Sequence, residues 1–160
     1  MPAHDLSLQL WRERELLELM LFKLETLQTL LATGQNRWIS HATVEVERVV
    51  DALSSVSLLR ATMVASVGEE WGAGGNASLR ELIENAPEDV WRDVFREHRD
   101  AMLRLATEIQ GAKDVGEQRV RTALRVTQET IAGLGAPTGA YDDSGGVVRD
   151  GSSRLLDTNV

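Results

Sequence analysis

The sequence contains no cysteine, which excludes disulfide bonds, thiolate metal sites and cysteine nucleophiles. Basic residues are also scarce, because 17 Lys and Arg stand against 25 Asp and Glu and leave a formal net charge of -8. Nucleic acids and anionic membranes are bound by basic surfaces, so neither is an expected partner.

Long apolar segments are missing as well. No run of 18 apolar residues occurs, so no membrane span is expected. The first residues, MPAHDLSL, lack the basic start and apolar run of a signal peptide. Together with the absence of cysteine, these features lead us to expect a cytoplasmic protein.

Aromatic residues make up only 4% of the chain, whereas apolar residues make up 42%. The core is therefore expected to consist mainly of Leu, Val, Ile and Ala side chains. A length of 160 residues corresponds to one domain, or to one domain and a tail.

The chain is organised around a predicted helix over residues 5–32, which contains no Pro or Gly and is rich in Leu, Glu, Gln and Arg. Asp5 or Ser7 is expected to cap its start. Its apolar residues follow the alternating four-three spacing of a coiled-coil seam, interrupted once by Glu13. The seam consists of Leu6, Leu10, Leu17, Met20, Leu24, Leu27 and Leu31. Further leucines widen it, so more than one partner helix is expected.

A second helix is predicted over residues 37–71. The connection before it is short and contains Gly34, so the second helix must run back antiparallel to the first. Its seam is interrupted once by Arg60 and consists of Ile39, Ala42, Val46, Val49, Leu53, Val56, Met63 and Val67.

Two further helices are predicted, a short one over residues 78–85 and a long one over 87–134. Ser78 and Glu81 match a capping box, and Pro87 is expected in the first turn of the long helix. Gly111 and Gly116 interrupt the apolar pattern of the long helix, so we expect its last part to fray or bend when no partner is bound.

These patterns predict an all-α protein, an elongated antiparallel hairpin or three-helix coiled-coil-like bundle with a short extra helix. The bundle is expected over residues 1–134. Residues 135–160 are rich in Gly, Ser and Asp and are expected to form a flexible, disordered tail.

A search for catalytic and metal-binding patterns finds none. The segment GAGGNA at 72–77 fits a dinucleotide motif formally, but it follows a helix rather than a strand. No Glu precedes a His by three residues, as a di-metal bundle would require. We therefore expect no enzyme activity, no cofactor and no metal. His98 is expected to be a partly buried packing residue. Glu13 is expected to be paired with an Arg or to lie near the end of the bundle, and the alternative is a buried acid on the seam.

The four tryptophans admit two interpretations. Each lies near a predicted helix end or on a seam, which favours a role in capping the core. The alternative is an exposed aromatic patch for interactions. The residues concerned are Trp11, Trp38, Trp71 and Trp91.

The ordered part of the chain resembles actinobacterial FlgN-type flagellar export chaperones. The resemblance rests on LWRERELLE at 10–18 and LFKLE at 21–25, followed by TGQNRW at 33–38. The segments ASLREL at 77–82, WR at 91–92, HR at 98–99 and LLD at 155–157 also fit.

The resemblance implies a cytoplasmic chaperone of the flagellar type III export pathway. Such chaperones hold the hook-filament junction proteins FlgK and FlgL by their C-terminal helical segments and deliver them to the export gate protein FlhA. A tyrosine after the last helix contacts the gate in this family, and this role would fall to Tyr141.

The helix after Gly116 has an apolar face that could cover such a client helix. The candidate client-binding residues are Val120, Leu124, Thr127, Ile131 and Leu134. The alternative is that these residues simply complete the bundle. A different kind of protein, a structural coiled-coil adaptor that self-associates through the seam of the first helix, also stays open. We expect a monomer or a weak homo-oligomer.

Overall fold

The computed structural model describes residues 1–134, without the side chains of Val120, Ala123, Leu124 and Thr127. Its elements are α1 (Pro2–Ala32), the 3-10 turn η1 (Asn36–Trp38), α2 (Ile39–Glu70), α3 (Leu79–Asn85) and α4 (Asp89–Gly133). No strand occurs over the described residues, which confirms the predicted all-α bundle. The chain divides after Gln118 into two compact units. The tail predicted over 135–160 lies outside the described residues.

The start of α1 differs from the prediction. The helix begins at Pro2 rather than near Asp5, and no side chain caps it. Proline suits the first helical position because the missing N–H would be unpaired there in any case. Asp5 therefore lies in the first turn, where its charge is favourable to the helix dipole, and does not act as the cap.

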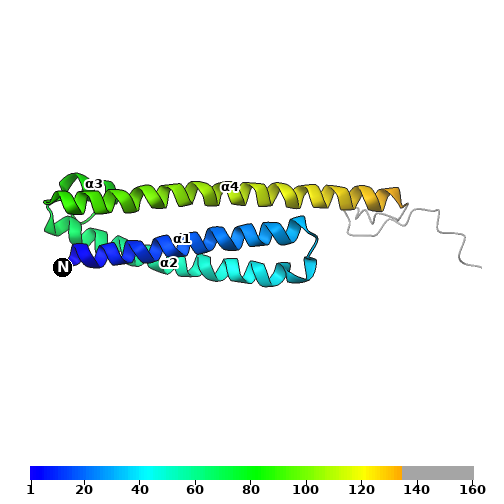
Figure 1. Ribbon diagram of the computed structural model, residues 1–160, viewed down its shortest axis with the longest axis horizontal. Coiled ribbons are helices and arrows are strands. Elements are labelled where there is room, and N and C mark those ends of the chain that lie inside the picture. The colour runs from blue at the N-terminus through cyan, green and yellow to red at the C-terminus, as the bar shows by residue number, and fades with distance from the viewer. Residues whose placement is uncertain (135–160) are drawn as a thin grey trace, which may run out of the picture. The chain divides into compact units, whose positions relative to one another are not determined.

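The turn between α1 and α2 follows the prediction more closely. Gly34 adopts a φ of +68°, the left-handed conformation in which glycine carries no steric penalty. The turn continues through η1 and reverses the chain, so α1 and α2 lie antiparallel side by side (Figure 1). Contacts between the two helices fix this direction, because Gln9 reaches the Val56 carbonyl whereas Lys23 reaches Glu45.

The short helix α3 begins with the predicted capping box. The Ser78 hydroxyl accepts from the backbone N–H of Glu81, and the Glu81 carboxylate accepts from the backbone N–H of Ser78 at 2.6 Å. The backbone N–H and the hydroxyl of Ser78 both donate to the Glu81 carboxylate, and these two bonds lower the pKa of Glu81 below its ordinary value because they favour the charged form.

The α2–α3 loop is held against the end of α2. The backbone N–H groups of Ala73 and Gly74 both donate to the Gly68 carbonyl, at 2.8 and 3.0 Å. A Cβ at Gly68 would lie 2.4 Å from the Gly74 carbonyl oxygen. Glycine at this position therefore permits the close approach of the loop.

The long helix α4 begins at Asp89, so Pro87 precedes it rather than lying in its first turn. It is helical through Gly111 and Gly116 and continues to Gly133, so the expected fraying after Gly116 is not observed. Each glycine costs about 1 kcal/mol relative to alanine, which is too little to break a long hydrogen-bonded helix. Within the first unit α4 runs parallel to α1: Ser7 contacts His98, and the Gln28 amide donates to the Ala112 carbonyl.

The core lies at one end of the first unit, where α1 begins and α2 ends. Phe95 is fully buried there between the rings of Trp71 and Trp91, with centroid separations of 5.7 Å. The buried core residues are Ala3, Leu6, Leu10, Val64, Val67, Leu82, Ile83 and Phe95. Four elements contribute to this cluster, so α1, α2, α3 and α4 are all anchored at this end.

Among the described residues, the stretch 36–70 is long and apolar enough to cross a bilayer by composition alone. The sequence search for an unbroken apolar run did not identify it. Length and composition alone are weak evidence for a membrane span, and 11% of the apolar window of this stretch is buried inside the protein. Val49, Val64 and Val67 of this helix are buried in the first unit, and its Arg60 pairs with Glu13 of α1.

Candidate interaction surface

The five predicted client-binding residues all fall on or just after the last turns of α4. The structure describes the side chains of two of them, and both are exposed: Ile131 by 40% and Leu134 by 78%. The side chains of Val120, Leu124 and Thr127 lie outside the described part, and so does the whole of Tyr141. Val126, which sequence analysis did not select, is also exposed on this helix.

His98 forms the main polar contact between α4 and α1. Its ring is 2% exposed and lies edge-on to Trp11, with centroids 5.2 Å apart. Arg14 donates to Nδ1 over 3.3 Å, because a guanidinium has no acceptor. The ring proton must then be on Nε2, which donates to the Ser7 hydroxyl over 3.2 Å. The predicted packing residue therefore also joins two helices through a defined tautomer.

This environment keeps His98 neutral. Burial is the main cause that lowers its pKa below the ordinary value, and the charge of Arg14 lowers it further, whereas Glu97 acts in the opposite direction. Arg14 itself lies 4.1 Å from the centre of the Trp11 ring and 3.7 Å from Glu97. Protonation of His98 would place two donors opposite one another and break the contact with Arg14.

Glu13, the polar break in the seam of α1, is buried against α2. Its two carboxylate oxygens accept from Arg60 Nε at 2.6 Å and from the Ser57 hydroxyl at 2.9 Å. The pairing with an Arg is confirmed, and the partner is the residue that breaks the seam of α2. The two interruptions therefore form one ion pair between the facing seams of α1 and α2.

The tryptophans divide between the two interpretations. Trp71 and Trp91 are half-buried and pack against Phe95, so they cap the core. Trp11 and Trp38 are 48% and 43% exposed. Each of these two is covered in part by a cation, Arg14 over Trp11 and Arg37 over Trp38.

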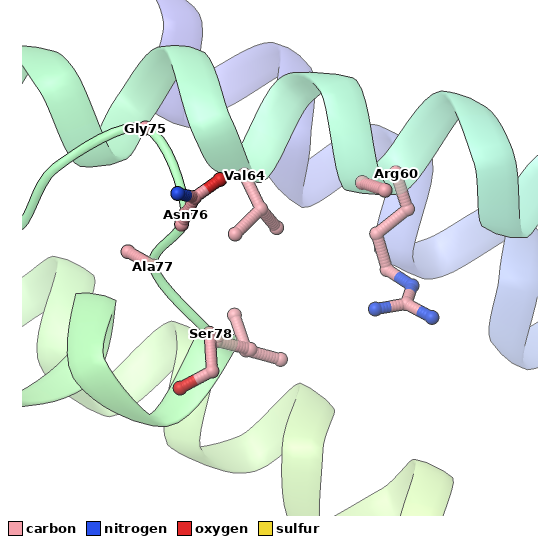
Figure 2. A pocket seen from close by; sticks show the side chains of 8 residues that line it. Arg60, Val64, Gly75, Asn76, Ala77 and Ser78 are labelled. Carbon is pink, nitrogen blue, oxygen red and sulfur yellow. The ribbon is translucent and has the colours of Figure 1, made fainter.

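A cavity of about 390 Å³ lies between α2 and the loop that leads to α3 (Figure 2). Arg60 and Val64 extend from α2, and the segment from Gly75 to Ser78 forms the opposite wall. The lining combines apolar side chains with the Asn76 amide, the Ser78 hydroxyl and the Arg60 guanidinium, which is already paired with Glu13. The Ser78 hydroxyl is likewise engaged in the capping box.

Over the described residues, no group of His, Asp and Glu side chains is arranged to hold a metal ion. The buried polar groups that do come together, around His98 and Glu13, join helices to one another. The fold and these contacts define an all-α bundle whose exposed apolar side chains suit helix-to-helix interaction.

Comparison with protein families then identifies the chain more closely. The family model described as FlgN protein matches residues 1–149. The chain therefore belongs to the FlgN family, a family of flagellar export chaperones. Neither the comparison with curated proteins nor the comparison with solved structures gave a match.

Proposed function

We propose that this protein is a cytoplasmic chaperone that binds the C-terminal helical segments of FlgK and FlgL. It prevents their premature association and delivers them to the export gate FlhA. The match to the FlgN family carries this proposal, since it extends over 149 residues and includes the whole of α4 as well as Tyr141. In this proposal the client lies on the face of α4 formed by the five predicted residues.

The exposure of Ile131 and Leu134 on this face supports the proposal. Before assembly into the filament junction, a client helix exposes the apolar face that later forms the junction contact. An amphipathic helix of a chaperone can cover this face. Ile131 and Leu134 expose apolar side chains that such a contact would bury. Burying one leucine side chain contributes about 1.5–3 kcal/mol to the free energy of binding, which is compatible with a reversible contact.

Point variants test the client site. Replacing Ile131 and Leu134 together by Glu should reduce co-purification with FlgK or FlgL at least tenfold, because two carboxylates would be buried against an apolar helix. Val126→Glu is the matched control, since Val126 is exposed on the same helix but does not belong to the proposed face. Undiminished binding by the double variant would exclude this placement of the client.

A truncation tests the same site independently. Removing residues 118–160 should leave a folded helical protein by circular dichroism but abolish co-purification with the client. Retained client binding would move the site into the first unit.

Tyr141 is proposed to contact FlhA. Tyr141→Ala should retain client binding and lose binding to the cytosolic domain of FlhA. An unchanged affinity for FlhA would remove this role and leave the client proposal intact.

The alternative, self-association through the seam of α1, is disfavoured by one observation. Leu6, Leu10 and Met20 of that seam are buried within the chain and are not available to a second copy, whereas the other seam leucines are half-buried. The mass in solution, measured by sedimentation, distinguishes the two hypotheses, because an obligate adaptor would remain oligomeric on dilution.

A further inference from the structure

The outer face of α2, which points away from α1, carries a second set of residues at coiled-coil spacing. Successive steps of four and three residues connect them, as on the inner seam. The set, here called the outer face, consists of Glu47, Asp51, Ser54, Leu58, Ala61, Ala65 and Glu69. All are exposed except Ala65, which is half-buried.

The middle of the outer face carries no free charge. Between Ala52 and Gly68 the one charged residue is Arg60, and its guanidinium is bound to Glu13 at 2.6 Å. Leu58 is 73% exposed. Its neighbours one turn away on either side are small, and one of them, Ala61, also lines the cavity beside the α2–α3 loop. These neighbours are Ser54, Ser55, Ala61 and Thr62.

The hydroxyl groups around Leu58 are already hydrogen-bonded. Ser54, Ser55 and Thr62 each donate to the carbonyl four residues earlier, at 3.0, 3.2 and 3.3 Å. A hydroxyl whose donor is satisfied by its own helix loses less on removal from water. This surface therefore behaves as more apolar than its composition indicates, and covering it costs little.

Acidic residues bracket the neutral surface at both ends. Glu47 and Asp51 precede it, and Glu69 and Glu70 follow it. None of the four forms an ion pair with another described residue, although Arg48 lies beside the first two and acts on Glu45. Asp51 and Glu69 are separated by about 27 Å at 1.5 Å per residue.

We propose that the outer face of α2 docks a single helix of a partner protein whose contact face is uncharged in the middle and basic at both ends. The basic residues of the partner would lie about 18 residues apart, opposite Asp51 and Glu69. A second copy of the chain does not fit. An antiparallel pair would place Asp51 against Glu69, and a parallel pair would place each acid against its own copy.

The size of this face sets the strength of the contact. Residues 54–65 extend over about 18 Å, and one helix on such a surface buries less than the roughly 1,200 Å² of a standard stable interface. The affinity should therefore be micromolar. The acidic ends then fix the orientation and accelerate association at low salt. The inference is independent of the proposed client site, because it uses only residues 47–69.

Two designed helical peptides test the proposal on the full-length protein. Both have the same Ala, Leu and Ser centre and a length of about 25 residues, and they carry either Lys or Glu at both ends. Fluorescence anisotropy at low salt should show micromolar binding of the Lys peptide, at least tenfold tighter than that of the Glu peptide. Failure of the Lys peptide to bind, or equal binding of both, would overturn the proposal.

Variants locate the binding to this face. Leu58→Glu should weaken binding of the Lys peptide at least tenfold, whereas Leu103→Glu, at a 52% exposed leucine on α4, should leave it unchanged. Converting Glu47, Asp51 and Glu69 together to Lys should reverse the preference between the peptides. If Leu58→Glu does not weaken binding of the Lys peptide, the proposal is contradicted. The proposal would also be contradicted if the protein self-associates in sedimentation and Leu58→Glu abolishes this self-association, since a second copy would then occupy the face.

Discussion

The two ends of the α1–α2 hairpin carry the same seam but differ in how completely it is covered. At the end where α1 begins and α2 ends, Leu6, Leu10 and Val67 are fully buried. At the end with the turn, no residue from Leu21 to His41 is buried. The difference arises because α3, the glycine loop and the aromatic residues around Phe95 cover only the first end. A regular apolar pattern thus sets where helices can meet, whereas the additional elements decide how much surface is removed from water.

Matched substitutions on α1 should give the largest effect and test this comparison directly. Leu10→Ala should destabilise the protein by about 3–5 kcal/mol, because it opens a cavity in the packed end. Leu24→Ala, at a half-buried position of the same seam, should cost about 1 kcal/mol. Urea unfolding measures both. Equal losses would mean that the open end is as tightly packed as the other.

The ion pair between Glu13 and Arg60 lies in the packed part of the hairpin and should have the next largest effect. Glu13→Ala leaves the Arg60 guanidinium and the Ser57 hydroxyl without their buried acceptor, which should cost about 1–3 kcal/mol. Arg60→Met added to Glu13→Ala should recover part of the loss, since no charge remains unpaired. Together with Arg60→Met alone, these variants form a double-mutant cycle, and absence of coupling in it would show that the pair does not contribute to the free energy of unfolding.

Two glycines provide a matched test of backbone packing. Gly68→Ala should destabilise by about 1–3 kcal/mol, because its Cβ would clash with the Gly74 carbonyl and displace the loop. Gly111→Ala should instead stabilise by about 0.5–1 kcal/mol, since nothing lies within 4 Å and alanine favours the helix. Thermal unfolding of the two variants measures whether each substitution raises or lowers the stability. A destabilising Gly111→Ala would indicate that α4 requires flexibility at that point.

His98 makes the contact between α1 and α4 sensitive to pH. Because its pKa is lowered in the folded state, the unfolded chain takes up a proton first as the pH falls below about 6.5. Stability should therefore decline as the pH falls below that value and level off below the folded pKa. His98→Gln should flatten this part of the stability profile. A wild-type profile that matches the variant would show that His98 does not titrate in this way.

Much of the fold could be predicted from local patterns. The four-three spacing placed the helices, the sequence from Ser78 to Glu81 gave the capping box, and Gly34 marked the turn. These features depend on residues close together in the chain, so they can be recognised without a structure. The start of α1 was wrong by three residues, because Pro2 can begin a helix without a side-chain cap.

The contacts between helices could not be predicted in the same way. Arg14 and His98 are 84 residues apart, and nothing in the spacing of either residue indicates the other. The outer face of α2 was also missed, because its serines and alanines look unremarkable until their exposure and hydrogen bonds are known. The client residues were selected by periodicity along one helix, and their role stays a prediction; of the five, Ile131 and Leu134 have described side chains, and both are exposed.

The sequence by itself determined that this chain forms long amphipathic helices, that no cysteine chemistry takes place and that the surface is acidic. These properties follow from composition and from periodicity along one helix. The tertiary structure alone decided which end of each seam is closed, which polar residues pair across helices and which face of α2 remains uncovered. The reason is that burial depends on neighbours distant in the chain, and the same apolar pattern is compatible with a covered or an open surface.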